Sequence, residues 1–357
     1  MKRSIMFATL TGCVGASVAS AQPLNLAESG SLNRFGASFR PGFNIEANFT
    51  GLGGFARRTE PGPNDTSASV DRNYDDGYNR VDVSGNVGRL TGYWGYDHGV
   101  GDLANQTPID GDVVIMNSSV SAAVGTSPNR GNDPQLGFEV TYNRRLGHLG
   151  KSAWGLELAF NWTDVDIHDR NNASAPVNRI SDAYSLGGIT PPLDAPPAPA
   201  YRGTFSGLGA LISDVPERSI HVLPNGARIT GERLLEASVY GWRVGPYLDV
   251  PVCSRVALSF SAGLAVAYVT SDFSFSENVT IPGVGTELHS GAGSRDEVLL
   301  GYYASGLISF AVCEQVNLFA GVQYQDVGNF WQTVGSQTAA LDLGKSIFMT
   351  LGLSWSF

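Results

Sequence analysis

The sequence predicts an all-β protein, an antiparallel up-and-down β-barrel that crosses a membrane, and three observations lead to this fold class. The last eleven residues alternate large apolar side chains with small or polar ones. Short turns alternate with long connections along the chain, as they do in membrane barrels. Aromatic residues recur at about one membrane crossing from the short turns.

The last strand, 347–357, has the clearest pattern. Its large apolar positions are Ile347, Met349, Leu351, Leu353, Trp355 and Phe357. Its length matches the ~9–11 residues of a tilted strand that spans a bilayer. This ending resembles the C-terminal strand of bacterial outer-membrane β-barrel proteins, the small eight-stranded barrels of the OmpA and OmpW kind. The resemblance implies that the barrel-insertion machinery recognises Leu351, Leu353, Trp355 and Phe357, and it implies no activity.

The N-terminal stretch predicts a secretory signal over residues 1–21. A basic start and an apolar run precede Ala19-Ser20-Ala21, which is the pattern of a signal cleaved after its last alanine. The alternative is a lipoprotein signal, because Leu10-Thr11-Gly12-Cys13 resembles a lipoprotein box with Cys13 lipidated. The apolar run continues past Cys13, which favours the longer signal. We expect 22–34 to be a periplasmic lead-in and 35–357 to be the barrel with its loops.

Composition favours a membrane barrel over a soluble enzyme. The chain has 44 glycines among 357 residues and 16% charged residues, against roughly 25% in ordinary globular domains. Outside the predicted signal, no stretch reaches the ~18 apolar residues of a membrane helix. The formal charge of −10 argues against nucleic acid as a partner. No phosphate-binding glycine loop or zinc-spaced Cys/His set occurs, so we expect no cofactor.

Alternation predicts eight crossings, at 35–49, 135–146, 153–163, 236–250, 256–270, 298–312, 316–325 and 343–357. An even number places both termini in the periplasm. Large extracellular loops are then expected at 51–134 and 164–235, and ten strands is the alternative if 51–134 supplies a further pair. Pro41 predicts a bulge or a strand end in the first crossing. The proline-rich stretch 190–199 is expected to be extended and unpaired.

Aromatic residues are expected to form two belts at the lipid headgroups. The outer belt comprises Trp162, Trp242, Tyr268, Tyr302 and Tyr324, and the periplasmic belt comprises Trp154 and Trp355 with Phe357. The outer set lies roughly 8–12 residues from the nearest short turn, close to one crossing. A soluble sandwich has no reason to arrange its rings in this way.

The faces opposite the apolar ones predict a charged barrel interior. By alternation, the residues expected to point inward are Arg40, Glu46, Glu139, Arg145, Glu157, Arg243, Asp249 and Gln323. Charges in a barrel this narrow must be paired. The expected arrangement is a closed barrel held by internal ion pairs. The alternative is a narrow pore that opens when those pairs rearrange.

Three further groups were candidates for chemistry. His168, with acidic neighbours, is the best candidate base for a hydrolase at the membrane edge, although a solvated loop histidine explains it better. Asp71, Asn73, Asp75 and Asp82 follow a calcium-loop spacing imperfectly, and ordinary turn residues explain them equally well. Cys253 and Cys313 follow the same Val-Cys-x-x-Val pattern in two turns. We expect them to be unbridged, because two strand spacings (~10 Å) separate the turns.

The sequence therefore predicts an integral outer-membrane protein without enzymatic activity, in contact with lipid and the insertion machinery. Its extracellular loops are expected to act in structure or in binding a surface partner or ligand, since binding usually resides in loops on a rigid scaffold. A small pore or transporter of small or apolar solutes is the alternative. An outer-membrane lipid or ester hydrolase is the least favoured hypothesis.

Overall fold

The structure, a computed structural model, describes residues 32–64, 70–81, 89–96, 113–131, 133–186 and 211–357. Regular structure in these residues is β throughout. No helix among them is long and apolar enough to cross a membrane. The predicted signal, most of the lead-in and the proline-rich stretch 190–199 lie outside the described residues.

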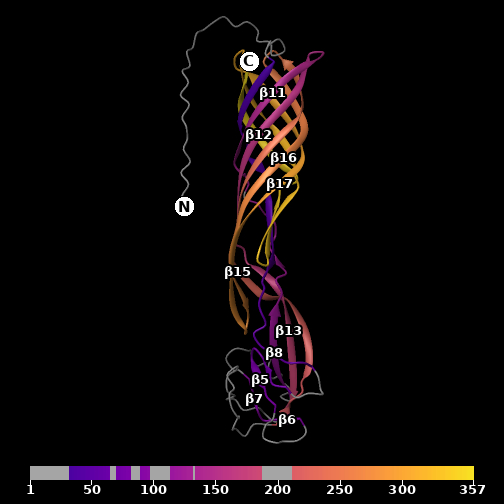
Figure 1. Ribbon diagram of the computed structural model, residues 1–357, viewed down its shortest axis with the longest axis vertical. Coiled ribbons are helices and arrows are strands. Elements are labelled where there is room, and N and C mark those ends of the chain that lie inside the picture. The colour runs from indigo at the N-terminus through magenta and orange to yellow at the C-terminus, as the bar shows by residue number, and fades with distance from the viewer. Residues whose placement is uncertain (1–31, 65–69, 82–88, 97–112, 132, 187–210) are drawn as a thin grey trace.

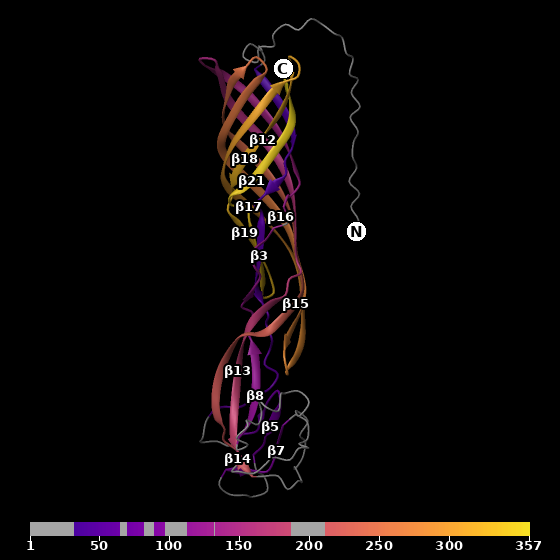
Figure 2. The same ribbon diagram turned by 180° about the vertical axis from the view of Figure 1, so that it is seen from behind.

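The main sheet closes on itself. Antiparallel pairings run from β1 (Asn33–Phe39) through β11 (Gly137–Leu149), β12 (Ser152–Asp169), β15 (Glu217–Cys253), β16 (Val256–Ile281), β17 (Gly285–Ala311), β18 (Val316–Asp326) and β21 (Ser346–Ser356), and then back to β1. Figures 1 and 2 show the barrel that this circuit forms, with the C-terminus at its rim. A closed sheet leaves no free strand edge within the circuit.

One end of the barrel carries short turns, and the other end has walls of unequal height. Turns around 150–151, 254–255 and 312–315 join neighbouring strands at the C-terminal rim. At the opposite end β18, β21, β1 and β11 stop early, while β12, β15, β16 and β17 continue. The 26 residues of β16 span about 85 Å at the usual rise per residue. The crossings predicted in β15, β16 and β17 are therefore parts of much longer strands.

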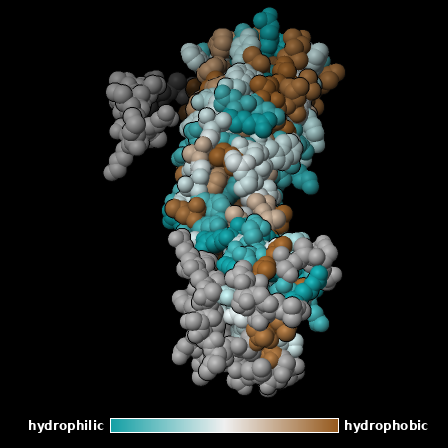
Figure 3. Space-filling view, turned by 60° about the horizontal axis from the view of Figure 1, so that its bottom comes forward, coloured by the Kyte–Doolittle hydropathy of each residue, from teal (hydrophilic) through white to brown (hydrophobic). Residues whose placement is uncertain are grey.

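Around the barrel, side chains alternate between an apolar outside and a mostly polar inside. Phe35 is paired with Trp355 and Leu318 with Leu353, and all four are exposed. Figure 3 shows hydrophobic surface gathered toward the end with the short turns. Polar residues such as Gln323 are buried on the opposite face of the same strands.

The first predicted crossing, 35–49, is wrong as a single strand. The strand breaks at Arg40 and Pro41, but the two-residue β2 (Gly42–Phe43) is still paired with β21 in the barrel wall. The chain then turns at Asn44, whose φ is +59°. The expectation of a break near Pro41 is confirmed. The next strand, β3 (Glu46–Leu52), belongs to another sheet, and its side-chain alternation is reversed relative to β1.

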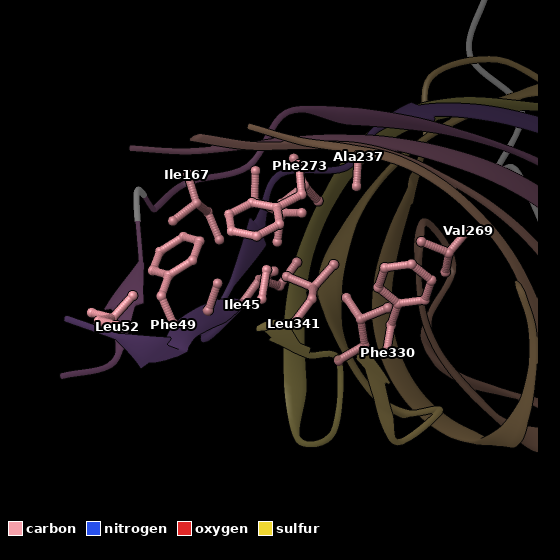
Figure 4. Packing of buried hydrophobic residues seen from close by; sticks show 14 of the residues in the cluster. Ile45, Phe49, Leu52, Ile167, Ala237, Val269, Phe273, Phe330 and Leu341 are labelled. Carbon is pink, nitrogen blue, oxygen red and sulfur yellow. The ribbon is translucent and has the colours of Figure 1, made fainter. Parts of the chain in front are cut away.

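This second sheet has five strands. β3 is paired with β20 (Gln337–Asp342), β9 (Gly125–Thr126) and β10 (Arg130–Gly131), and β20 is paired with β19 (Asn329–Val334). Its inner face packs against the tall strands, burying Phe49, Phe330 and Leu341 against Val269 and Phe273 (Figure 4). We call this sandwich the stalk. It consists of the five strands and of the parts of β12, β15, β16 and β17 that continue beyond the barrel, which in β12 begin at Asp164.

A third part, the head, lies beyond the stalk (Figure 1). β13 (Ala173–Ser185) lies between β8 (Val113–Ser121) and the first half of β15. Short strands β4 (Arg72–Asn73), β5 (Gly77–Asn79) and β7 (Trp94–Tyr96) form one small sheet, and β6 (Leu90–Thr91) is paired with β14 (Ile212–Ser213). A separate core gathers Tyr74, Trp94, Val114, Met116, Tyr184, Leu186 and Ile212.

The segments predicted as loops, 51–134 and 164–235, therefore hold much of the stalk and head. β12 runs six residues past 163, and β15 begins at Glu217 rather than at 236. Strands of two or three residues, such as those between 72 and 96, give little alternation to detect.

Candidate functional site: the barrel interior

Four buried charged residues fill the middle of the barrel. Arg40 Nε lies 3.2 Å from Glu139 Oε2, and Arg243 Nη2 lies 2.7 Å from the same oxygen. Arg243 Nη1 lies 3.4 Å from Glu157 Oε1. All four side chains are at most 6% exposed. Two arginines and two glutamates thus form a chain of alternating charge, which is the condition for burying them without a large desolvation penalty.

Neighbouring strands hold this network in place. The Arg40 guanidinium lies 3.3 Å from the centre of the Phe348 ring, and that of Arg243 lies 4.3 Å from the Tyr303 ring. Ser261 donates a 3.0 Å hydrogen bond to Glu157. Cation–π contacts and charge-assisted hydrogen bonds of this kind are strongest where water is excluded. The network is therefore fixed by packing as well as by charge.

The other residues predicted inside have varied positions. Gln323 is buried and donates to Gln325, which accepts from Arg40 at 3.0 Å. Asp249 lies near the short-turn rim and is paired with Arg34 at 2.9 Å. Arg145 is half-buried in the last part of β11. Arg34 was missed because it was assigned to the lead-in, whereas β1 begins at Asn33.

The prediction that Glu46 points into the barrel is wrong. The turn at Asn44 reverses the alternation, so Ile45 and Ala47 face the core while Glu46 faces outward on the second sheet. Its carboxylate accepts a 3.1 Å hydrogen bond from Asn129. Nothing in the alternation of 35–49 reveals this reversal, because the pattern continues evenly across the turn.

Two small cavities flank the network in the barrel interior. On the short-turn side, a cavity lined by Arg34, Glu157, Ser305 and Thr350 has about 30 Å³ for the centres of water molecules, enough for two or three waters. On the other side, Ile45, Val239, Val327, Leu343 and Phe348 surround a space of only about 10 Å³. These apolar side chains continue into the stalk core. Buried charged and apolar side chains thus occupy the barrel interior around these two cavities.

The predicted aromatic belts occupy the outside of the barrel. Trp162 packs against Phe138, and Trp242 against Phe160, each with 5.6 Å between ring centres. Tyr268 contacts Tyr240 at 6.4 Å, and Tyr302 contacts Tyr324 at 6.2 Å. At the short-turn rim, Trp355 contacts Phe357 at 6.2 Å and Trp154 is exposed. The residues predicted to form the insertion signal, Leu351, Leu353, Trp355 and Phe357, are all exposed on the outer face.

The structure does not gather the calcium candidates into one cage. Asp75 accepts hydrogen bonds from Thr59 and Ser119, Asn73 accepts from Arg80, and Asp71 accepts from the Val81 amide. Asp82 lies outside the described residues. No group of three or more His, Cys, Asp or Glu residues placed to hold a metal occurs in the described part of the chain.

The histidine and cysteine candidates are exposed. His168 contacts Asp166 at 3.0 Å, and within the described residues no hydrogen bond joins it to a serine. His221, expected in a loop, lies on β15 with its Nε2 2.9 Å from Ser219 Oγ. No carboxylate contacts this histidine in the part of the chain described. Cys253 and Cys313 are both free thiols.

A second buried ion cluster lies in the stalk, where the sequence predicted only loop. Arg233, fully buried on β15, contacts Asp169 at 2.7 Å and Glu277 at 3.3 Å. Burial acts to raise the pKa of Asp169, but hydrogen bonds from Asn171 and the charge of Arg233 together lower it. Burial raises the pKa of Glu277 despite the same arginine. Arg233 lies between Glu232 and Leu234 in a predicted loop, and these neighbours give no sequence signal that it is buried.

The head has its own buried polar group. Arg218 donates to both oxygens of Asp182, at 2.7 and 2.6 Å, and the Tyr74 hydroxyl donates to the same carboxylate at 2.6 Å. Burial raises the pKa of Tyr74 and of Tyr184, whose hydroxyls lie 2.7 Å apart. These groups are satisfied by one another, and their arrangement holds β13, β15 and β4 together.

No protein-family model matches the chain, and no curated protein matches it either. Among solved structures it is similar to Ail of Yersinia pestis in complex with the heparin analogue sucrose octasulfate, at 9% identity and a TM-score of 0.27, covering 91% of this chain and 99% of that one. It is also similar to OprG of Pseudomonas aeruginosa (11%, TM-score 0.25, covering 90% and 96%). The outer membrane protease OmpT of Escherichia coli is similar too (9%, TM-score 0.26, covering 92% and 98%).

These three are outer-membrane proteins, and at such TM-scores they carry no argument about what this chain does. The fold rests on the chain's own geometry. An antiparallel sheet that closes on itself, with an apolar outside and a charged, filled inside, is the fold of an outer-membrane β-barrel.

Proposed function

We propose that the chain is an integral outer-membrane protein whose closed, non-conducting barrel of eight strands anchors a stalk and head outside the cell for interaction with a surface partner. The short turns and both ends of the barrel domain lie on the periplasmic side. Lipid contacts the outer face of the barrel, and the insertion machinery recognises Leu351, Leu353, Trp355 and Phe357. No enzymatic step is part of this function.

The outer surface of the barrel supports the membrane position. The apolar outer residues run from the short turns to the ring pairs Tyr240–Tyr268 and Tyr302–Tyr324. Tyr268 lies twelve residues beyond Val256, the first residue of β16, close to one tilted crossing of ~9–11 residues. Beyond this level the outward residues become acidic, with Asp166 paired to Glu236 and Glu236 to Asp272. Carboxylates at these positions are suited to water rather than to hydrocarbon.

The closed interior is the observation that carries the proposal. A pore requires a continuous wet path, and here the Arg40–Glu139–Arg243–Glu157 network and the apolar group around Ile45 and Phe348 fill the axis. Opening it would separate buried charges from their partners, at a cost of about 3–5 kcal/mol for each broken pair. Such a barrel is suited to anchoring rather than to transport.

The size and order of the outer part support a role in interaction. The strands of stalk and head are held by two hydrophobic cores and two buried ion clusters. An anchor alone needs no such structure, since loops of a few residues suffice to join membrane strands. A rigid scaffold that presents sheet faces away from the membrane is typical of binding proteins.

Planar-bilayer recording tests this function. The purified full chain should insert without producing stepwise currents in 1 M salt over 150 mV of either sign, because the axis is blocked. Protease digestion of the same proteoliposomes, added from outside, should remove head segments and leave the barrel fragment protected. Regular conductance steps in most insertions would overturn the proposal in favour of the small pore.

A further inference from the structure

The outer face of the second sheet carries three rows of side chains with one large ring among them. Trp331 on β19 is 49% exposed, and the small side chain of Ala340 is paired next to it, followed by Asn48 on β3. The next row outward consists of threonines from four strands, Thr333, Thr338, Thr50 and Thr126. The row nearest the barrel holds Asn329, Asp342 and Glu46. We call these three rows the Trp331 face.

The inner face of the second sheet packs in the stalk core, whereas the Trp331 face does not. Phe330, on the inner side next to Trp331, is fully buried in the stalk core, so the sheet is already stabilised from that side. An exposed tryptophan adds nothing to this packing and presents an apolar ring to water. Tryptophan is the residue most enriched at binding hot spots, because it offers a large, rigid contact area.

The polar groups around the ring indicate the chemistry of its partner. Threonine hydroxyls and asparagine amides both donate and accept hydrogen bonds, which matches a ligand rich in hydroxyl groups. Thr333 and Thr338 contact each other at 2.8 Å. The backbones of Asn48 and Asn329 are paired in the sheet, while their side-chain amides make no hydrogen bond to a described residue. A flat ring flanked by such groups suits a sugar, whose apolar C–H face stacks on the ring while its hydroxyls reach the polar side chains.

Charge narrows the class of sugar. The three rows contain the carboxylates of Glu46 and Asp342 and no lysine or arginine. Sulfated or phosphorylated glycans, and the phosphorylated glycolipids of the bacterium itself, would be repelled by these carboxylates without a cation to bind them. The occupant must therefore be neutral. Three rows and four strands cover about 13 by 14 Å, the area of a two- or three-sugar unit.

The face stands where an external glycan can reach it. Trp331 is seven residues beyond Tyr324 of the outer aromatic belt, so it lies at most about 23 Å from that level along the chain. The rows are on the side of the second sheet away from the tall strands, and the described residues place no other strand over them.

We infer that the Trp331 face binds a neutral, hexose-containing oligosaccharide supplied from outside the cell, with the sugar ring stacked on Trp331 and its hydroxyls bonded to Asn48 and the threonine row. This rests on the proposed function, since it names the class of partner for a surface-interaction protein.

Calorimetry on the purified full chain tests the inference, in a detergent without a sugar headgroup. The panel comprises neutral di- to tetrasaccharides of glucose, galactose and mannose, each with its sulfated counterpart. At least one neutral compound should bind, Trp331→Ala should weaken it tenfold or more, and Trp331→Phe should keep part of the affinity. Leu288→Ala, which removes another exposed apolar side chain, from β17 outside the Trp331 face, is the control and should bind as the parent does.

Three results would each overturn the inference: no binding of any neutral glycan at millimolar concentration, binding that Trp331→Ala leaves unchanged, or equal binding of the sulfated counterparts. Circular dichroism of both Trp331 variants verifies that the sheet is folded. The bilayer recordings are independent of these results. A silent bilayer with no glycan binding ends this inference alone, whereas conductance ends the proposed function whatever the glycans do.

Discussion

Arg233, the buried arginine of the stalk, allows the most direct test of what stabilises the stalk. Replacing Arg233 by methionine keeps much of the side-chain volume but leaves Glu277 without its arginine and Asp169 with only Arg130, whose Nε lies 3.4 Å from Asp169 Oδ1. Both carboxylates are at most 1% exposed, at 2.7 and 3.3 Å from the arginine they would lose. Removing one partner from a buried ion cluster costs about 3–5 kcal/mol. We therefore expect Arg233→Met to destabilise the stalk by that amount.

The stability of the stalk should depend on pH, in a direction set by the pKa shifts of Asp169 and Glu277. In the parent chain the lowered pKa of Asp169 stabilises the fold above its unfolded pKa and is lost as the pH falls through its folded pKa. The raised pKa of Glu277 acts oppositely, because its penalty is relieved as the pH falls. In Arg233→Met the pKa of Glu277 should rise further, and the pKa of Asp169 should rise from its lowered value although Asn171 and Arg130 still contact it. The stalk of the variant should therefore gain stability on going from pH 7 toward pH 4, unlike the parent.

Hydrogen exchange followed by mass spectrometry measures this locally. Amides in 228–237 and 272–281 should exchange roughly a hundredfold or more faster in Arg233→Met at pH 7, since each 1.4 kcal/mol is about tenfold. Arg228→Met, an exposed arginine on the same strand, should exchange like the parent. Adding Asp169→Asn and Glu277→Gln to Arg233→Met should recover much of the protection. Exchange in Arg233→Met within threefold of the parent would refute this account of the cluster.

Three further outcomes are expected. Phe273→Ala, in the stalk core, should destabilise the stalk by about 3–5 kcal/mol and leave the barrel folded, as read by protease digestion of the stalk. Asp182→Asn should loosen the head by about 3 kcal/mol, because Arg218 and Tyr74 lose a shared charged acceptor; exchange in β13 faster by less than threefold would contradict this. Arg243→Leu leaves Glu139 and Glu157 without their common partner. The thermal unfolding midpoint of this variant should therefore fall by several degrees. Arg144→Leu, at an exposed position of β11, should leave the midpoint unchanged.

The barrel could be predicted from the sequence because lipid imposes a simple rule on it. In strands with lipid on one side and a polar interior on the other, apolar and small or polar side chains alternate at every residue, as in 347–357. The positions of the turns follow from where this alternation stops. The inward positions of Arg40, Glu139, Glu157 and Arg243 follow from the same alternation. That these residues contact one another depends on strand tilt and stagger, which the pattern does not contain.

The stalk and head could not be predicted in the same way. In the stalk, β16 continues past the membrane with Phe273, Val279 and Ile281 on its buried side, but their partners come from β3 and β19, far away in sequence. The turn at Asn44 exchanges the buried and exposed positions, but the apolar alternation of the sequence continues unchanged across it. The prediction for Glu46 is wrong for this reason. Trp331 lies between the predicted crossings 316–325 and 343–357, where no strand was predicted, although Phe330, Gln332 and Val334 alternate with Trp331 and Thr333 as in a strand.

Labelling with a membrane-impermeant maleimide tests most directly whether a closed barrel carries the stalk and head outside the cell. Cys253 and Cys313 are free and exposed at the short turns, and Thr333 is exposed on the stalk. In intact cells, Thr333→Cys in a background with serine at 253 and 313 should be labelled, while the native cysteines of the parent should react only after the outer membrane is permeabilised. Labelling of the parent in intact cells, with Thr333→Cys protected, would contradict the account.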